Sequence, residues 1–567
     1  MVSGSAGSLL TSSRAPSVMY VVDTHATSGT PLTSTPARAR KVQVGASKRH
    51  AFLVASGIFL SRIAGLIRER VFAHYFGSSD AADAFKAAFR IPNFLQTMFG
   101  EGVLSASFIP VYAALLAQED EEEAARTAGA IAGLLGLTTS AIVVIGVLLT
   151  PYLIDAIAPG FHGAKRQLTI HLVQILFPGA GLLVFSAWCL GILNSHKRFF
   201  LSYTAPVLWN AAMIGTMLGW GGRYSQFPLA IFLAWGSVVG SGLQVVIQFP
   251  TVLKLLHHLR VTLNYQTAHV KEVVHNFVPV FVGRGVVQIS AYVDAVLASL
   301  LPTGAVAGLA YAQILFMLPV SLFGMSVSAA ELPHMSGAVG TDNEVAPVLR
   351  ARLNSGLRQI AFFVVPSIAA FLILGDVIIG AIFRTGRFTQ ADVIYVWGIL
   401  AGANVGLLAS TLGRLYSSTY YALRDTRTPL RYAIIRVLLT SALGYACAIP
   451  LPPMLGIQPR WGVAGLTISA GVASWVEFTL LRRTLNRRIG KTGLPAAYTV
   501  KIWVAAVGAA GAAWLIHRWF QHHSPVLAAV VVLVPFGVLY FAATLALGLS
   551  EIRTMFERFL GAVNRAR

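Results

Sequence analysis

The sequence consists of long apolar runs separated by short polar segments. Runs such as Ala132 to Leu149 and Val526 to Leu547 reach the length of about 20 residues that a helix needs to cross a bilayer. Counting such runs predicts about 14 transmembrane helices. Their approximate ranges are 51–73, 83–115, 126–157, 168–194, 202–221, 227–256, 272–301, 304–334, 357–383, 392–422, 430–450, 461–481, 498–517 and 525–548. The pattern therefore predicts an all-α polytopic membrane protein.

Composition excludes a soluble fold. Of 567 residues, 56% are hydrophobic and 11% are charged, whereas soluble domains contain roughly 25% charged residues. The net charge of +21 would favour nucleic-acid binding in a soluble chain, so the placement of the cations has to decide its meaning.

The cations are distributed unequally between the two sets of predicted loops. If the cluster from Arg38 to Arg49 is cytoplasmic, about 26 Lys and Arg residues fall on that side and about 7 on the other, a positive-inside pattern. The charge therefore indicates orientation and not a nucleic-acid partner. An even number of helices places both termini on the same side, so we expect a multi-pass protein of the cytoplasmic (inner) membrane with cytoplasmic N- and C-termini.

The order of the spans predicts five parts. We expect a disordered basic cytoplasmic tail at 1–48, an N-lobe of six helices at 49–256, a C-lobe of six helices at 257–481, two further helices at 482–548 and a cytoplasmic tail at 549–567. Two six-helix lobes around a central cavity are an arrangement that transporters use for alternating access. Cys189 and Cys447 fall in apolar helices and are expected to be packing residues.

Charged residues inside a membrane helix call for a functional explanation, because each costs at least ~2.5 kcal/mol at the centre of the bilayer. The first predicted helix contains Arg62, Arg68 and Glu69. At about 100° per residue, Arg62 and Glu69 share a stripe and Arg68 lies about 120° around the helix. Gly65 leaves room beside them.

The second predicted helix has a polar stripe in which residues recur every three or four positions: Asp83, Lys86, Arg90, Asn93, Thr97 and Glu101. Pro92 is expected to kink this helix. The two helices together offer cations suited to a phosphate or diphosphate, and carboxylates to balance them. For Arg70 and Lys86 we favour positions at the membrane faces and purely structural pairs.

The seventh predicted helix contains Arg284 and, about 15 Å further along, Asp294. Arg284 could meet an anionic substrate, and Asp294 is a candidate for binding a coupling cation or proton. An interhelical ion pair that only fixes packing is the alternative. Arg414 and Arg436 are further intramembrane charges.

Sequence motifs for catalysis are missing. The chain has no Walker loop, no His-Glu-x-x-His motif and no nucleophile elbow. We therefore expect no enzymatic activity, no cofactor and no metal site.

A set of motifs spread over nearly the whole chain after the tail resembles the MurJ/MviN family, within the larger superfamily of MATE-like exporters. These motifs are Ser61-Arg62 with Gly65 and Arg68-Glu69, Asp83-Ala84-Phe85, Pro92-Asn93, Glu101-Gly102, Ala158-Pro159-Gly160-Phe161, Ile192-Leu193-Asn194, Arg198-Phe199, Ala205-Pro206 with Asn210, Gln288-Ile289-Ser290, Leu332-Pro333 with Ser336, Gly386-Arg387-Phe388-Thr389 and Asp425-Thr426-Arg427-Thr428-Pro429.

The resemblance implies a flippase for lipid II, a polyprenyl-diphosphate-linked peptidoglycan precursor. It implies 14 helices, two six-helix lobes around a cationic cavity, and a groove for the lipid tail beside the last two helices. The family's cavity arginines fall on Arg62 and Arg68, and its acidic residue on the second helix falls on Asp83. Cell-wall synthesis proteins are the partners that such a role would imply.

Two positions depart from the family pattern. Gln96 and Ile314 stand where the family commonly has arginine. Either Arg284 restores the lost charge, or the substrate differs from lipid II. The resemblance thus implies a lipid II flippase, which we expect to work by alternating access, driven by membrane potential or a coupled cation. The alternatives are a flippase for another polyprenyl-diphosphate-linked glycan, a non-transporting membrane scaffold and, least favoured, a drug or cation exporter.

Overall fold

The computed structural model describes residues 37–257, 259–337, 342–520, 523–549 and 551. Within helices, it leaves out the side chains of residues 37–55, 101, 282–291 and 342–343. Every regular element in these described ranges is a helix, as the sequence predicts. The chain divides into two units, Met1–Phe52 and Leu53–Arg567. Helix α1 (Ala37–Phe76) begins inside the range 1–48 that the sequence predicts as a disordered tail.

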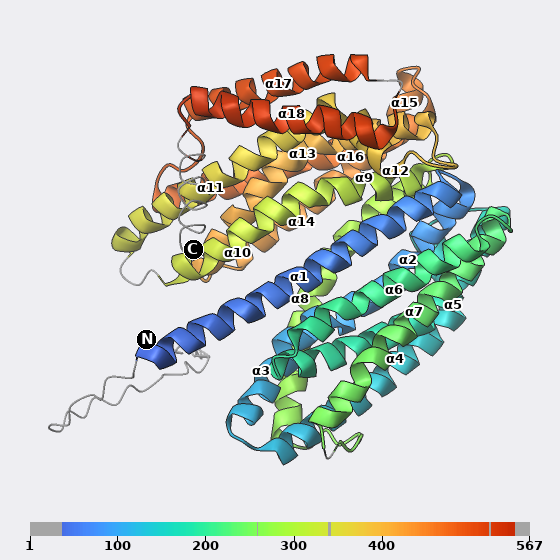
Figure 1. Cartoon of the computed structure of the whole chain (residues 1–567), viewed down its shortest axis with the longest axis vertical. Coiled ribbons are helices and arrows are strands. Elements are labelled where there is room, and N and C mark those ends of the chain that lie inside the picture. Colours follow the sequence, from blue (N-terminus) through green and yellow to red (C-terminus); the bar gives the residue numbers. More distant parts are fainter. Residues whose placement is uncertain (1–36, 258, 338–341, 521–522, 550, 552–567) are drawn as a thin grey trace, which may run out of the picture. The chain divides into compact units, whose positions relative to one another are not determined.

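Six helices after α1 form a first bundle (Figure 1). They are α2 (Asp80–Phe99), α3 (Glu101–Ala117), α4 (Glu121–Ile157), α5 (Gly163–Ser195), α6 (Phe199–Trp220) and α7 (Gln226–Leu255). Helix α5 lies at the centre of this bundle, where it packs against α2, α4 and α7. Helix α2 continues through Pro92 and ends at Phe99, so the interruption of the predicted span 83–115 lies at Gly100.

The remaining helices build a second bundle around α13 and α16. They are α9 (Ala305–Pro319), the π-helix η1 (Val320–Met325), α10 (Ser326–Ser336), α11 (Asp342–Ile373), α12 (Gly375–Phe383), α13 (Gln390–Ala422), α14 (Arg427–Ala448), α15 (Leu451–Met454), the 3₁₀-helix η2 (Pro459–Trp461), α16 (Gly462–Ile489), α17 (Ala496–Trp519) and α18 (Pro525–Ala546). The last two helices pack on each other, on α11 and on α12.

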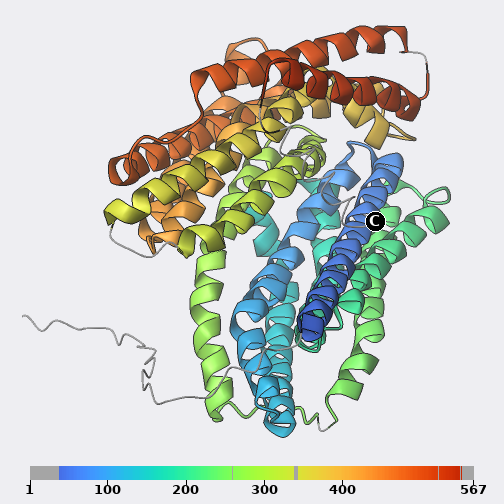
Figure 2. The ribbon, with the colours of Figure 1, turned by 60° about the vertical axis from the view of Figure 1, so that its left-hand side comes forward.

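Helix α8 (Ala268–Ser299) contacts both bundles. Its first half packs on α3 and on the end of α2, where Phe277 and Phe281 contact Phe99. Its second half packs on α14, where Leu297 faces Gly444. Figure 2 shows α8 as the light green helix that runs beside the blue α2 and α3.

Eleven helical segments of the described residues are long and apolar enough to cross a membrane. The predicted spans 51–73, 202–221 and 272–301 coincide with α1, α6 and α8. These three are not among the eleven, so the count of 14 stays a prediction. Large apolar side chains are exposed along the spans, such as Leu148 on α4, which is 71% exposed. Such surfaces suit contact with lipid tails.

The connection between α7 and α8 lies along α4. A Cβ atom on Gly129 would sit 2.1 Å from the carbonyl oxygen of Arg260, and one on Gly133 would sit 2.3 Å from that of Thr262. Four residues of helix rise about 6 Å, which matches two residues of extended chain at about 3.3 Å each. The connection is therefore extended here, and the two glycines permit its close approach to α4.

Candidate substrate-binding site

Glu69 of α1 holds two cations in the interior of the protein. Its carboxylate accepts a hydrogen bond from Arg68 at 2.8 Å and one from Lys86 of α2 at 2.5 Å. The guanidinium of Arg68 also lies over the ring of Trp209, and the amine of Lys86 lies over the ring of Phe72. Lys86 is thus mostly buried, whereas the sequence favoured a membrane-face position for it.

Further charged side chains continue from this group into the second bundle, each acting electrostatically on the next. Lys86 is followed by Arg90 of α2 and Asp294 of α8. Asp294 is followed by Arg436 of α14, which pairs with Glu477 of α16 at 3.0 Å. Arg414 of α13 lies near both members of that pair.

We call these eight residues the charge chain, in the order Arg68, Glu69, Lys86, Arg90, Asp294, Arg436, Glu477 and Arg414. They comprise five cations and three carboxylates, which leaves an excess of two positive charges. An excess of one sign of charge inside a membrane protein is costly unless a ligand or ion compensates it. The charge chain can therefore accommodate an anion.

Arg62 extends the cationic surface of α1. It is exposed, and its guanidinium lies 3.5 Å from the hydroxyl of Ser321 in η1. Pro319 comes directly before the π-helical turn and has no N–H to donate. π-Helical turns are frequent at functional sites. Arg62 and Ser321 thus bring α1 next to an irregular turn of the second bundle.

Asp83 occupies a different place from the arginines with which the sequence grouped it. Its buried carboxylate accepts hydrogen bonds from the side chain of Lys165 at 2.7 Å and from the backbone N–H groups of Gly304 and Ala307 at 2.8 and 2.7 Å. The two backbone donors belong to the N-terminus of α9, where a carboxylate is favoured by the helix dipole. Asp83 therefore joins the first bundle to the second.

Other contacts between the bundles lie at the same end of the helices, which we call the outer end after the predicted orientation. Asp80 accepts a hydrogen bond from Thr303 at 2.8 Å and pairs with Lys165 at 3.0 Å. Further contacts in this set are Tyr311 Oη to the carbonyl of Gly77, Arg70 to the carbonyls of Ala381 and Ile382, and His74 to Thr385. The outer end is closed by these bonds.

Asn93 of α2 lies near Arg68. It is exposed and lines a small pocket that also contains Gln96 and Trp209, the ring over which Arg68 lies. Arg284 lies on α8, but its side chain is outside the described residues. Ile314 is half-buried on α9. The structure thus brings Arg68, Glu69 and Asn93 together, places Arg62 on the same helix, and separates Asp83 from them.

The sequence predicts Arg414 and Arg436 only as intramembrane charges and indicates no role for Glu477. Their positions on three different helices show no spacing that would group them. A signal was nonetheless present, because each is a charged residue inside an apolar run.

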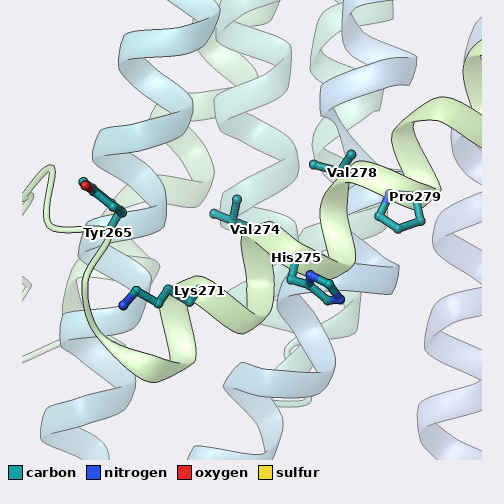
Figure 3. A pocket seen from close by; sticks show the side chains of 6 residues that line it. All are labelled: Tyr265, Lys271, Val274, His275, Val278 and Pro279. Carbon is teal, nitrogen blue, oxygen red and sulfur yellow. The ribbon is translucent and has the colours of Figure 1, made fainter. Parts of the chain in front are cut away.

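Two pockets among the described residues lie apart from the charge chain. One of about 460 Å³ is lined by Tyr265 and by five residues near the start of α8, among them Lys271 and His275 (Figure 3). Helix α8 runs about 22 Å between Pro279 of this pocket and Asp294. Another, of about 320 Å³, is lined by Asp376, Arg384, His517 and neighbours. Among the residues that the structure describes, no three His, Cys, Asp or Glu side chains lie together as metal ligands.

Comparisons with known proteins agree with this architecture. A family model described as lipid II flippase MurJ matches residues 72–535. A protein of Burkholderia cenocepacia named lipid II flippase MurJ is 31% identical over 470 residues, covering 81% of this chain and 87% of the relative.

Two solved structures share the fold. One, of lipid II flippase MurJ in an inward closed conformation, has a TM-score of 0.70 and 22% identity, covering 90% of this chain and 99% of that one. The other, an inward-facing transporter of the MATE family, has a TM-score of 0.60 and 17% identity, covering 77% and 98%.

Proposed function

The chain belongs to the lipid II flippase MurJ family, and from this premise we propose that it moves lipid II across the cytoplasmic membrane by alternating access. The diphosphate of the head group binds near Arg62 and Arg68, while the polyprenyl tail remains in the lipid. The protein is a multi-pass membrane transporter, and we propose that both termini face the cytoplasm and that it performs no chemical reaction.

The excess of cations in the charge chain is the observation that carries this proposal. Five cations face three carboxylates, and Arg62 adds another positive charge on α1, about 9 Å along the helix from Arg68. A diphosphate supplies the missing negative charge, and arginine binds phosphate oxygens in a bidentate geometry. A site for cationic drugs would need the opposite charge.

The closed outer end supports alternating access. Asp83 bridges α2 and α9, while Arg70 of α1 donates to carbonyls at the end of α12. These bonds must break for the head group to leave on the outer side. We therefore propose that this is a state in which release to the outside is blocked.

Membrane potential determines the direction of transport in this scheme. An empty site with an excess of two positive charges is drawn toward a negative interior, and moving each charge is worth about 2.3 kcal/mol per 100 mV. A di-anionic head group neutralises that excess. The loaded site therefore reorients with little electrical work, and the potential acts mainly on the return of the empty site.

Asp294 is our candidate for ion coupling. Among the described side chains, none donates a hydrogen bond to its buried Oδ1 atom, and the charges that act on it are Arg90 and Arg436. Two guanidinium groups repel a metal cation, so we propose a proton as the coupled ion. Asp294→Asn is expected to retain lipid binding and to remove the dependence of flipping on a proton gradient across proteoliposomes. An unchanged response to the gradient would contradict this role.

Flipping of lipid II by reconstituted protein tests the main proposal. The variants Arg62→Gln and Arg68→Gln are expected to lower the flipping rate about 10- to 100-fold, because each removes a charge-assisted hydrogen bond worth about 1.5–3 kcal/mol. Arg223→Gln changes an exposed arginine in the loop between α6 and α7 and serves as the control. Flipping by both cavity variants at the parental rate would refute the assignment.

Complementation distinguishes lipid II from another polyprenyl-diphosphate-linked glycan. We expect the chain to rescue cells depleted of their own lipid II flippase. Failure to rescue, with flipping of a different diphosphate-linked glycan in proteoliposomes, would favour the alternative cargo. A scaffold would retain neither lipid.

A further inference from the structure

Arg414 stands out on a helix that is otherwise mostly buried. Its neighbours Gly413 and Leu415 are buried, yet Arg414 itself is exposed. Tyr421, two turns further along the same face of α13, is 49% exposed. Helix α13 therefore presents one open stripe, and a guanidinium lies in it.

Arg436 points away from the lipid-facing side of α14. The exposed large apolar residues Leu430, Ile434, Leu438 and Tyr445 recur at spacings of four and seven, which marks one stripe. Arg436 lies two residues after Ile434, about 200° around the helix. Its side chain pairs with Glu477 of α16 and acts on Asp294 of α8. The guanidinium thus faces the interior of the protein.

The two arginines compete for too few carboxylates. Glu477 pairs with Arg436 at 3.0 Å and is also the carboxylate that acts on Arg414. The next carboxylate along the charge chain, Asp294, is shared with Arg90 of the first bundle. Arg414 and Arg436 also repel each other. An anion placed between the two guanidinium groups would relieve this repulsion.

We propose that Arg414 and Arg436 form a second anion-binding site, which takes a phosphate or carboxylate group of the transported head group. This proposal rests on the proposed function and deepens it, because it gives the second bundle its own contact with the substrate. The first bundle holds one anionic group at Arg62 and Arg68, and the second bundle holds another. Glu477 occupies the arginines when the site is empty.

Opposite effects of Glu477 and Arg414 on lipid binding distinguish a second anion site from a structural ion pair. If Glu477 competes with substrate for the arginines, then Glu477→Gln strengthens lipid binding while Arg414→Gln weakens it. A purely structural ion pair predicts otherwise, because loss of Glu477 would then disturb the packing around Arg436 and weaken lipid binding. Arg431→Gln is the matched control. Arg431 is also an arginine of α14, but it is exposed and lies about one turn before Ile434.

Native mass spectrometry of the full-length protein in detergent measures the binding. Undecaprenyl diphosphate and lipid II are titrated separately into the parent, Arg414→Gln, Glu477→Gln and Arg431→Gln. We expect Arg414→Gln to weaken lipid II binding about tenfold, as the loss of a charge-assisted bond predicts. Arg431→Gln should bind as the parent does, and thermal unfolding of each variant is recorded in parallel.

The two lipids identify the anion. Weakened binding of both lipids assigns the second site to the diphosphate, and weakened binding of lipid II alone assigns it to a group on the glycan or peptide; both support the site. Parental affinity of Arg414→Gln for both lipids overturns it, as does weaker binding by Glu477→Gln. Failure here is distinct from failure of the proposed function, in which the parent itself would bind neither lipid.

Discussion

At the scale of single residues, two interior carboxylates, Glu69 and Glu477, each hold cations by direct ion pairs. Charge inside apolar runs located Arg68 and Glu69, which are neighbours on α1. The same signal could not group Arg414 with Glu477, because these lie on α13 and α16 and meet only after folding. Periodicity along one helix predicts a shared face but not which distant segment that face will meet.

The hydrogen-bond partners of Asp83 could not be predicted from the sequence either. The sequence placed it on a polar stripe with Lys86, yet its carboxylate accepts from Gly304 and Ala307 at the start of α9. Gly304 has a φ of +89°, a left-handed conformation that favours glycine. This turn thereby orients the backbone N–H groups at the start of α9 toward Asp83.

The variant Asp83→Asn is expected to loosen the outer end. It removes the charge from a buried acceptor of three hydrogen bonds, which we expect to lower the free energy of unfolding by about 1.5–3 kcal/mol. Asp80→Asn is the control, because Asp80 shares Lys165 but its side chain is 46% exposed, so its loss should cost below about 1 kcal/mol. Thermal unfolding in detergent measures both, and equal shifts would contradict the special position of Asp83.

At the scale of elements, hydrophobic pattern predicted the helices well and their interruptions poorly. The predicted span 83–115 breaks at Gly100 and the predicted span 304–334 contains the π-helix η1. The span 357–383 breaks at Leu374 between α11 and α12. A run of apolar residues indicates burial in lipid or protein, but it does not indicate where the backbone hydrogen-bond pattern of the helix changes.

Two tyrosines attach the final pair of helices to α11, and small residues of α17 are buried. Ala505, Ala506, Ala509 and Ala510 of α17 are buried. The hydroxyl of Tyr498 donates to the carbonyl of Arg358 at 3.0 Å, and that of Tyr540 donates to the carbonyl of Phe362 at 2.5 Å. Small side chains let helices approach closely in membranes.

A larger side chain at one of these buried positions of α17 should destabilise the protein. Ala506→Leu adds volume at a fully buried position, and overpacking of this kind costs about 1–3 kcal/mol. Val507→Leu adds volume at the next position, which is 47% exposed, and serves as the control. We expect a lower unfolding temperature for Ala506→Leu alone. A parental unfolding temperature for that variant would mean that α17 is not closely packed.

At the scale of the whole molecule, the charge chain and the closed outer end together describe one state of a transport cycle. Neither could be read from sequence, because each is assembled from helices far apart in the chain. The family resemblance predicted the fold and the cationic site, and family membership and the shared fold confirm the first of these.

Cross-linking the outer end tests whether its opening is needed for transport. The side chains of Asp80 and Thr303 are in contact, with Oδ1 and Oγ1 2.8 Å apart. Oxidation of the double variant Asp80→Cys/Thr303→Cys is expected to stop flipping, and reduction to restore it. Each single variant controls for loss of the native contacts. Continued flipping by fully cross-linked protein would contradict opening at this end.

The extended connection along α4 also limits how the molecule can open. Extended chain spans at most about 3.3–3.6 Å per residue, so the two residues from Arg260 to Thr262 cannot lengthen further while they pass Gly129 and Gly133. The connection can therefore separate from α4 only by leaving the surface beside these two glycines. We expect a motion that keeps this contact to rotate the bundles about the connection and not to slide them apart there.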